Sequence, residues 1–150
     1  LTEKEQSEEI PLGELALNHH TDPGILTLLF QDMVGGLQAL SKSIGWIDVP
    51  PKEDAIVVNL GDSLQVWTND NYRAAVHRAL LMDEFPRYSS PYFFNPARDA
   101  VLEPLSALSN DPPIYRPFTW QEYIRGRVDD NFAELDEDDI QISKYRFKSI

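Results

Sequence analysis

Residues 55–60 read AIVVNL, and this stretch gives the clearest indication of the fold. It is almost wholly aliphatic and rich in β-branched side chains, which pack well on the pleated surface of a sheet. The pair Gly61-Asp62 follows at once and is typical of a tight turn. We therefore predict a strand over Ala55–Leu60.

Similar short apolar runs, separated by Gly, Pro, Asn and Asp, occur on both sides of this strand. We predict further strands within residues 13–17, 25–30, 35–40, 46–49, 64–68, 76–83 and 92–95. Many short strands with turn signals between them are typical of an all-β sandwich or barrel. The predicted fold class is therefore an all-β core.

The C-terminal part of the chain has a different pattern. Thr119 precedes Trp120-Gln121-Glu122, so it is an N-cap candidate with a glutamate three positions later. We predict a helix from there to about Arg127, followed by an acidic, solvated loop over residues 129–139. The predicted organisation is a flexible arm (1–11), the β core (12–118), and a C-terminal helix and tail (119–150).

Composition restricts the class of function. A chain of 150 residues with 42% apolar side chains fits one domain with a sizeable core. Thirteen basic and 25 acidic residues give a net charge of −12, which argues against nucleic acid because phosphate binding needs clustered cations. No apolar run approaches the roughly 20 residues that cross a bilayer, and no secretory signal opens the chain, so we predict no membrane association. The lack of cysteine excludes disulfides and thiolate metal sites and fits the cytoplasmic location that we predict.

Two histidines and an aspartate form a candidate metal site. In His20-Thr21-Asp22, the first and third residues share one face of a strand, and His77 lies on a separate predicted strand. Two imidazoles and one carboxylate leave three octahedral positions open, an arrangement typical of non-haem Fe(II) oxygenases. A His-x-Asp pair alone is common by chance, so the interpretation depends on a further feature. His19 faces the other way and is predicted to be a surface residue.

That feature is Arg87-Tyr88-Ser89, ten residues beyond His77. Arg87 and Ser89 share one strand face, where a guanidinium can bind a carboxylate through two parallel hydrogen bonds and a hydroxyl can add a third. An exposed arginine on an edge strand is the plain alternative. Strand alternation places Phe93 on the same face, where it either lines a substrate pocket or packs in the core.

Four stretches of this sequence carry a family resemblance. They are HTDPGILTLLFQD (20–32), GWIDVPP (45–51), VVNLGDSLQVWTNDNYRAAVHR (57–78) and RYSSPYFFNP (87–96). With these motifs the chain resembles the iron(II) and 2-oxoglutarate-dependent dioxygenases, in the branch similar to isopenicillin N synthase. The resemblance implies a double-stranded β-helix, a jelly-roll barrel whose mouth holds the iron. It covers about residues 12–127 and corresponds to the C-terminal half of the longer family members, so we expect the N-terminal part of the family fold to be missing.

The resemblance also implies roles for individual residues. His20, Asp22 and His77 would ligate Fe(II), and Arg87 with Ser89 would hold the distal carboxylate of 2-oxoglutarate. Phe93 would contact the substrate, a small organic molecule that is hydroxylated, desaturated or cyclised while succinate and CO₂ are released. Dioxygen is the other cosubstrate, and ascorbate is a candidate reductant.

There are four alternatives to this function, and the residues argue against the last two. The chain could resemble the members that use no 2-oxoglutarate, such as isopenicillin N synthase and the ascorbate-using, ethylene-forming oxidase. It could be an inactive fragment that needs its missing half and associates with itself through exposed apolar edges. The chain could be a non-catalytic jelly-roll binding module, but such a copy would be expected to have lost a metal ligand. It could also be a Zn(II) hydrolase, but that function would leave the Arg-x-Ser pair unexplained.

Overall fold

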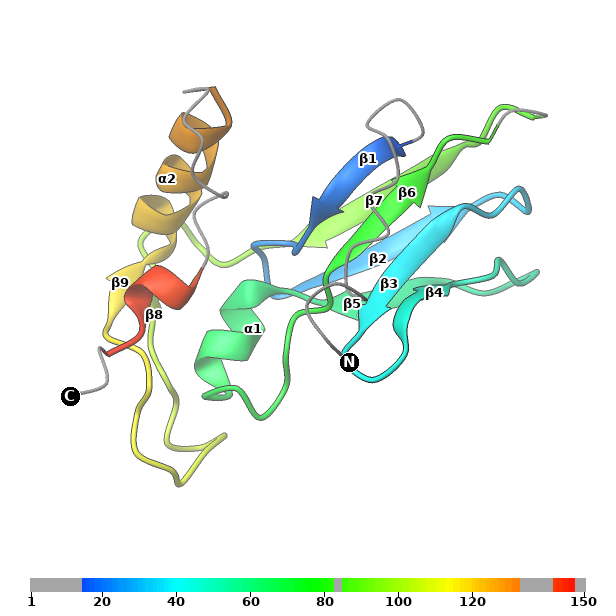
Figure 1. Ribbon diagram of the computed structural model, residues 1–150. Helices are drawn as coiled ribbons and strands as arrows, with labels where there is room; N and C mark the ends of the chain where they lie inside the picture. Colours follow the sequence, from blue (N-terminus) through cyan, green and yellow to red (C-terminus); the bar gives the residue numbers. More distant parts are fainter. Residues whose placement is uncertain (1–14, 83–84, 133–141, 148–150) are drawn as a thin grey trace. The chain divides into compact units, whose positions relative to one another are not determined.

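The structure, a computed structural model, describes residues 15–82, 85–132 and 142–147. Most of its regular elements are β-strands, which confirms the predicted β core (Figure 1). The strands are β1 (Leu15–His20), β2 (Leu26–Gln31), β3 (Leu37–Ser41), β4 (Gly45–Asp48), β5 (Val57–Leu60), β6 (His77–Leu80), β7 (Ser89–Phe94), β8 (Val101–Leu102) and β9 (Phe118–Thr119). The helices are α1 (Asp62–Trp67), α2 (Trp120–Phe132) and the 3-10 helix η3 (Ile142–Tyr145).

Backbone contacts divide the chain into two compact units. The first contains the described residues of 1–21, together with 27–59 and 75–92. The second contains 22–26, 60–74 and the described residues of 93–150. None of the helices in the described part of the chain is long and apolar enough to span a membrane.

An antiparallel four-stranded sheet in the order β1-β6-β3-β4 belongs to the first unit (Figure 1). The register of β1 and β6 shifts twice between Leu15 and His20. After these shifts His20 lies directly opposite His77. The pairing of two strands that are distant in sequence thus brings both histidines to the same end of the sheet. A second sheet has the order β5-β2-β7, with β2 in its middle.

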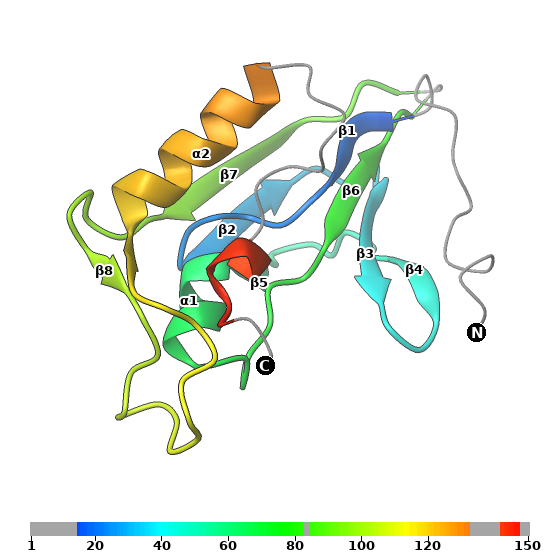
Figure 2. The same cartoon turned by 60° about the vertical axis from the view of Figure 1, so that its left-hand side comes forward.

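Aromatic side chains make the core of the second unit. The rings of Phe118 and Tyr145 stack with centroids 3.7 Å apart, and Tyr123 meets both of them edge-on. Val66 from α1 is fully buried in the same cluster. Figure 1 shows β9 leading directly into α2, which Figure 2 shows from a second side, and the pairing of β8 with β9 connects the helix to this core. The remaining members of the cluster are Leu102, Tyr115, Trp120 and Ile142.

The strand predicted within residues 64–68 is wrong, because this segment forms α1. Gly61, predicted to be in a tight turn, has an extended backbone and is the N-cap residue. Thr68 ends the helix, and both its backbone N–H and its hydroxyl donate to the carbonyl of Leu64. Five residues are too few for periodicity to separate helix from strand. The burial of Val66 in the aromatic core favours the helix.

The helix predicted after Thr119 is confirmed. The backbone N–H of Glu122 donates to the Thr119 hydroxyl at 3.1 Å, as an N-cap requires. The helix continues to Phe132, beyond the predicted end at Arg127, so the first residues of the predicted acidic loop are helical. No Gly or Pro interrupts 128–132. The rest of that loop and the predicted arm over 1–11 lie outside the described residues.

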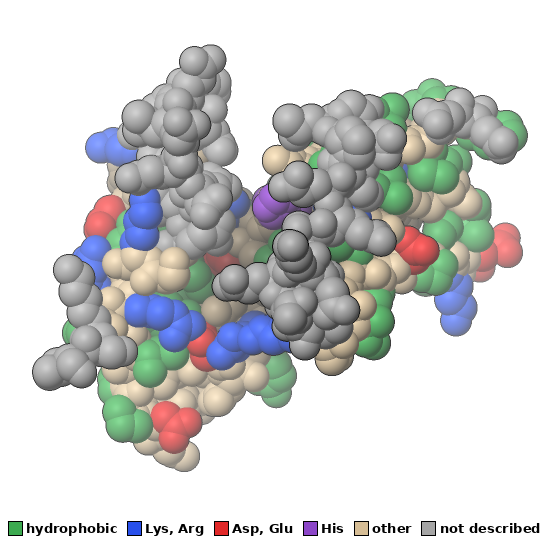
Figure 3. All heavy atoms as spheres, in the orientation of Figure 1, with side chains coloured by type: hydrophobic (Ala, Val, Ile, Leu, Met, Phe, Trp, Pro, Cys, Tyr) green, Lys and Arg blue, Asp and Glu red, His purple; other side chains and the backbone are tan. Residues whose placement is uncertain are grey.

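The edge of the second sheet carries exposed apolar side chains. All six residues of β7 are exposed, and Tyr92, Phe93 and Phe94 each show about half of their surface to solvent. Figure 3 shows hydrophobic side chains at the surface over the part of the molecule that contains the strands. Exposed, apolar edge strands are common sites of association.

We expect the 150-residue chain, made by itself, to associate through β7. Replacing Tyr92 by Lys should reduce association, because a charge on an edge strand disfavours pairing with another copy. Sedimentation velocity over a range of concentrations measures the effect. Tyr72→Lys is the matched control, since Tyr72 is a similarly exposed tyrosine outside β7. A parent chain that stays monomeric at every concentration would contradict the expectation.

Candidate metal centre

The structure brings together the three residues predicted to bind a metal. Each of His20, Asp22 and His77 offers a donor atom, and these atoms all lie within 4.8 Å of one another. The two imidazole rings have centroids 4.3 Å apart. Asp22 is buried, with 3% of its surface exposed, while both histidines are partly buried. Two nitrogens and one carboxylate oxygen are a donor set that suits a non-haem Fe(II) ion.

Backbone carbonyls orient both imidazoles. Nδ1 of His20 lies 2.8 Å from the carbonyl oxygen of Asn18, and Nδ1 of His77 lies 3.0 Å from that of Ala75. A carbonyl oxygen can only accept, so each Nδ1 is the donor, and in the neutral imidazole Nε2 then carries the lone pair. Histidines that bind metals usually have this arrangement, which fixes the ring and its tautomer. The donor set therefore fits a divalent metal in chemistry and in orientation.

The segment that carries Asp22 is held by the start of α1. The Asp22 carbonyl accepts from the backbone N–H of Asp62 at 2.8 Å, and the Gly24 carbonyl accepts from that of Ser63 at 3.0 Å. The Ser63 hydroxyl donates to the Pro23 carbonyl at 2.8 Å. These bonds leave the backbone of residues 22–24 little freedom.

Gly61 allows this close approach. A Cβ atom at position 61 would lie 2.2 Å from the carbonyl oxygen of Gly24 and 2.9 Å from that of Asp22. Both contacts are with backbone, which cannot rotate away as a flexible side chain could. Sequence alone predicts only a tight turn at Gly61. The structure shows that the missing Cβ atom of Gly61 lets α1 begin directly against the Asp22 segment.

The structure also brings together Arg87 and Ser89. The Arg87 Nη1 group donates to the Ser89 hydroxyl at 3.0 Å, and its Nε donates to the Gly35 carbonyl at 2.7 Å. Nη2 donates to the side-chain oxygen of Gln31 at 3.1 Å. The guanidinium thus has its orientation fixed by three groups. The sequence prediction missed Gln31, because its contact with Arg87 joins two segments that are 56 residues apart and no local pattern specifies it.

Asp32 stabilises the same stretch of backbone. Its carboxylate accepts from the backbone N–H groups of Tyr88, at 2.5 Å, and Val34, at 3.0 Å. These two bonds, with a smaller contribution from the positive charge of Arg87, lower the pKa of the Asp32 carboxyl below its usual value. Asp32 is therefore ionised at neutral pH and fixes Tyr88, which lies between Arg87 and Ser89.

Phe93 is exposed to nearly the same degree as its neighbours. It shows 49% of its surface, against 59% for Tyr92 and 51% for Phe94. Exposure therefore does not separate the two faces of β7, and the substrate contact stays a prediction. The alternative was that Phe93 packs in the core, but a side chain with about half of its surface exposed does not do so in this structure.

Arg78, the residue after His77 on β6, is buried. Only 5% of its surface is exposed, its Nε donates to the Gln38 side chain at 2.8 Å, and its guanidinium lies 3.9 Å above the Trp46 ring. This burial is possible because β6 is an inner strand of its sheet. Residues on both faces of an inner strand can be covered by side chains of neighbouring strands.

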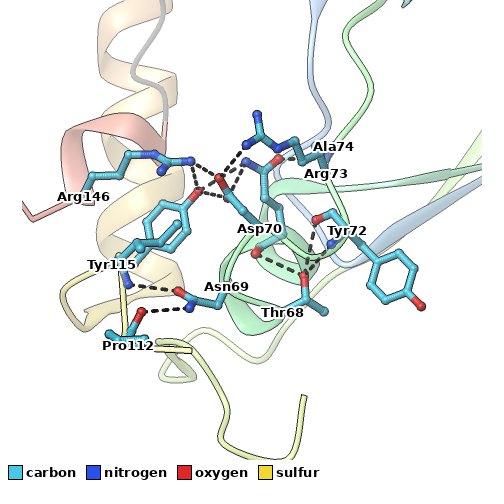
Figure 4. A network of polar contacts seen from close by, with 11 residues as sticks. Thr68, Asn69, Asp70, Tyr72, Arg73, Ala74, Pro112, Tyr115 and Arg146 are labelled. Carbon is cyan, nitrogen blue, oxygen red and sulfur yellow. Dashed lines mark hydrogen bonds and ion pairs between the residues drawn. The ribbon is translucent and has the colours of Figure 1, made fainter. Parts of the chain in front are cut away.

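A polar network fixes the loop between α1 and β6 (Figure 4). Asp70 accepts from the Tyr115 hydroxyl at 2.5 Å and from the Gln65 amide at 3.0 Å, and it forms an ion pair with Arg146. The Gln65 oxygen accepts from the backbone N–H of Ala74, three residues before His77. Burial, followed by the hydrogen bond to Asp70, raises the pKa of Tyr115 to about 12. The hydroxyl therefore stays protonated and continues to donate at neutral pH.

Comparison with known proteins decides the family. The model of the 2OG-Fe(II) oxygenase superfamily matches residues 3–96. The chain belongs to this superfamily. Solved structures of the superfamily match this chain with TM-scores of 0.73 at 32–34% identity, which confirms the predicted double-stranded β-helix, or jelly roll. Members of the superfamily use Fe(II), 2-oxoglutarate and O₂.

Several relatives show the extent of the likeness. Gibberellin 2-beta-dioxygenase 4 of Arabidopsis thaliana is 42% identical over 119 residues, which are 77% of this chain and 37% of that protein. 1-Aminocyclopropane-1-carboxylate oxidase 1 of Oryza sativa subsp. japonica is 44% identical over 113 residues, 73% of this chain and 35% of that protein. The crystal structure of the dioxygenase for auxin oxidation in rice has a TM-score of 0.73 at 32% identity, over 79% of this chain and 42% of that one. The chain thus spans about two fifths of the length of these relatives.

We expect His20→Ala, Asp22→Ala or His77→Ala to abolish binding of Fe(II) or Mn(II), because each removes one of three donors. Anaerobic calorimetric titration measures the affinity, and circular dichroism checks the fold. His19→Ala is the control, since His19 is adjacent to His20 and lies against Trp46 instead, with ring centroids 6.5 Å apart. Unchanged metal affinity in all three variants would overturn the assignment.

Proposed function

We propose that this protein is an Fe(II)- and 2-oxoglutarate-dependent oxygenase that acts on a small organic substrate. The observation that carries the proposal is the group of His20, Asp22 and His77, in which both imidazoles have their Nδ1 protons directed to backbone carbonyls. Bound Fe(II) would supply the activation of O₂, coupled to oxidative decarboxylation of 2-oxoglutarate to succinate and CO₂.

The ligand residues would bind the metal on one face. His20 and His77 would contribute Nε2, and Asp22 would contribute a carboxylate oxygen. With only three protein donors, the site would leave room on the metal for the keto acid end of 2-oxoglutarate and for O₂. The backbone bonds that hold residues 22–24 and the two imidazoles would keep these donors in place during turnover.

Arg87 and Ser89 would bind the other end of the cosubstrate. A guanidinium bound to a carboxylate through two hydrogen bonds gives both affinity and direction. The bonds from Arg87 to Gly35 and Gln31 hold the group in advance, so little side-chain freedom remains to be lost on binding. The Ser89 hydroxyl, already within hydrogen-bond distance of the guanidinium, would donate to the same carboxylate.

A second candidate is an oxidase that uses no 2-oxoglutarate. The observation in its favour is that 1-aminocyclopropane-1-carboxylate oxidases match this chain at 44% identity, as closely as the gibberellin dioxygenases do at 42–43%. In that case Arg87 and Ser89 would bind another carboxylate, and ascorbate would be the reductant. Succinate release distinguishes the two functions.

We expect Arg87→Lys to raise the apparent Michaelis constant for 2-oxoglutarate about 10-fold or more, and Arg87→Ala to raise it further. Lysine keeps the charge but loses the planar fork, and a hydrogen bond to a charged group contributes roughly 1.5–3 kcal/mol. Succinate formation as a function of 2-oxoglutarate concentration measures the constant. Arg73→Lys, at an exposed arginine paired with Asp70, is the control. Turnover that needs no 2-oxoglutarate and releases no succinate would favour the second candidate. Activity whose 2-oxoglutarate dependence is unchanged in both Arg87 variants would contradict the anion-binding role of Arg87.

Phe93 is proposed to contact the substrate. We expect Phe93→Leu to raise the Michaelis constant for the substrate while decarboxylation of 2-oxoglutarate without substrate continues. A purely structural phenylalanine would instead lower the melting temperature and both activities together. Tyr92→Leu is the control, because Tyr92 is the adjacent exposed aromatic residue and points to the other face of β7 by strand alternation. Equal effects of the two changes would contradict a specific contact.

A further inference from the structure

We propose that a buried cluster of Asp62, Tyr123 and Arg127 positions the metal ligand Asp22 and thereby makes metal affinity depend on α2. This inference rests on the metal site proposed above. The three side chains are themselves positioning residues, because they act on Asp22 through the backbone of α1.

The cluster is a carboxylate with two donors in a dry environment. Asp62 is 1% exposed, Tyr123 is fully buried and Arg127 is 7% exposed. The Tyr123 hydroxyl donates to Oδ2 of Asp62 at 2.5 Å, and Nη1 of Arg127 donates to the same oxygen at 3.0 Å. Arg127 also lies 3.2 Å from the Tyr123 hydroxyl, so the three groups contact one another.

Charge and burial hold this cluster in one arrangement. Burial, followed by the nearby negative charge of Asp62, raises the pKa of Tyr123, so its hydroxyl stays protonated and donates. A buried carboxylate without its cation would be an uncompensated charge, which a folded protein avoids. Tyr123 and Arg127 are four residues apart and therefore lie on one face of α2. Together they attach this face to the first residue of α1.

The same residue of α1 is attached to the metal ligand. The backbone N–H of Asp62 donates to the carbonyl of Asp22, while the Asp62 side chain is held by α2. Gly61 and Ser63, on either side of Asp62, also contact the Asp22 segment closely. A displacement of Asp62 would therefore move the backbone that carries the Asp22 carboxylate. All of these residues belong to the second unit.

A second cluster offers a matched comparison within the same unit. Asp70, Tyr115 and Arg146 again combine a carboxylate, a tyrosine and an arginine (Figure 4). The backbone N–H of Asp70, however, donates to the carbonyl of Gln65 within α1, whereas the backbone N–H of Asp62 donates to the carbonyl of Asp22. Damage to either cluster should destabilise the unit. His77 is held by the pairing of β6 with β1 and β3, so its position does not depend on the Asp70 loop alone. We therefore expect only damage to the Asp62 cluster to weaken metal binding as well.

The test compares Asp62→Asn and Tyr123→Phe with Asp70→Asn and Tyr115→Phe in the intact protein. Each substitution keeps the shape of the side chain and removes one charge or one hydroxyl. Cobalt(II) alone is titrated and followed by its visible absorption, well below the melting temperature of the least stable variant, and circular dichroism gives the melting temperatures without metal. We expect the first pair to weaken cobalt affinity about 10-fold or more, as loss of residues that orient metal ligands usually does, and the second pair to change it less than about twofold.

The outcomes separate this inference from the function on which it rests. His77→Ala is included, and cobalt binding that survives this change would overturn the metal site itself. If His77→Ala abolishes binding but the two pairs affect affinity equally at equal loss of melting temperature, the positioning role is wrong. Should Asp62→Asn fail to fold, Tyr123→Phe decides alone, because it keeps the ring packing and both buried charges.

Discussion

Antiparallel pairing between β1 and β6 places His20 opposite His77, and the candidate metal centre depends on this register. A slip of one residue would turn one of the two imidazoles to the other face of the sheet, because side chains alternate along a strand. Two irregularities in β1 precede His20, so the strand reaches this register only after local adjustment. Both imidazoles then bond to the carbonyl two residues earlier, which gives them the same tautomer by the same local geometry.

The carboxylate of the centre is held in a different way. Asp22 lies just beyond the end of β1, and its segment is held by α1 through the bonds of Asp62 and Ser63. A short helix has little intrinsic stability, since most helical stability in proteins comes from packing. Here α1 is stabilised by Val66 in the aromatic core and by the ion pair of Asp62 with Arg127. A ligand of the proposed iron therefore depends on a core far from it in sequence.

The candidate anion site shows the same division between a functional group and its support. Arg87 and Ser89 meet because they share a strand face, but the direction of the guanidinium is set by Gly35 and Gln31. The Asp32 carboxylate binds the backbone between them and has a lowered pKa, so it remains an acceptor at neutral pH. In the proposed function this site binds the distal carboxylate of 2-oxoglutarate, and these contacts explain why the direction of the guanidinium is already set before binding.

Sequence by itself determined the β class, the C-terminal helix with its Thr119 cap, and the identity of the groups in the candidate site. These features depend on short-range patterns: strand alternation, an N-cap with its nearby glutamate, and pairs of functional residues two positions apart. Only the tertiary structure decided that residues 62–67 form a helix, that Arg78 is buried against Trp46, and that Asp62 binds Tyr123 and Arg127. Each of these depends on partners that are distant in the sequence and that no local pattern specifies. A five-residue apolar run fits a strand or a helix equally, and the core against which it packs makes the choice.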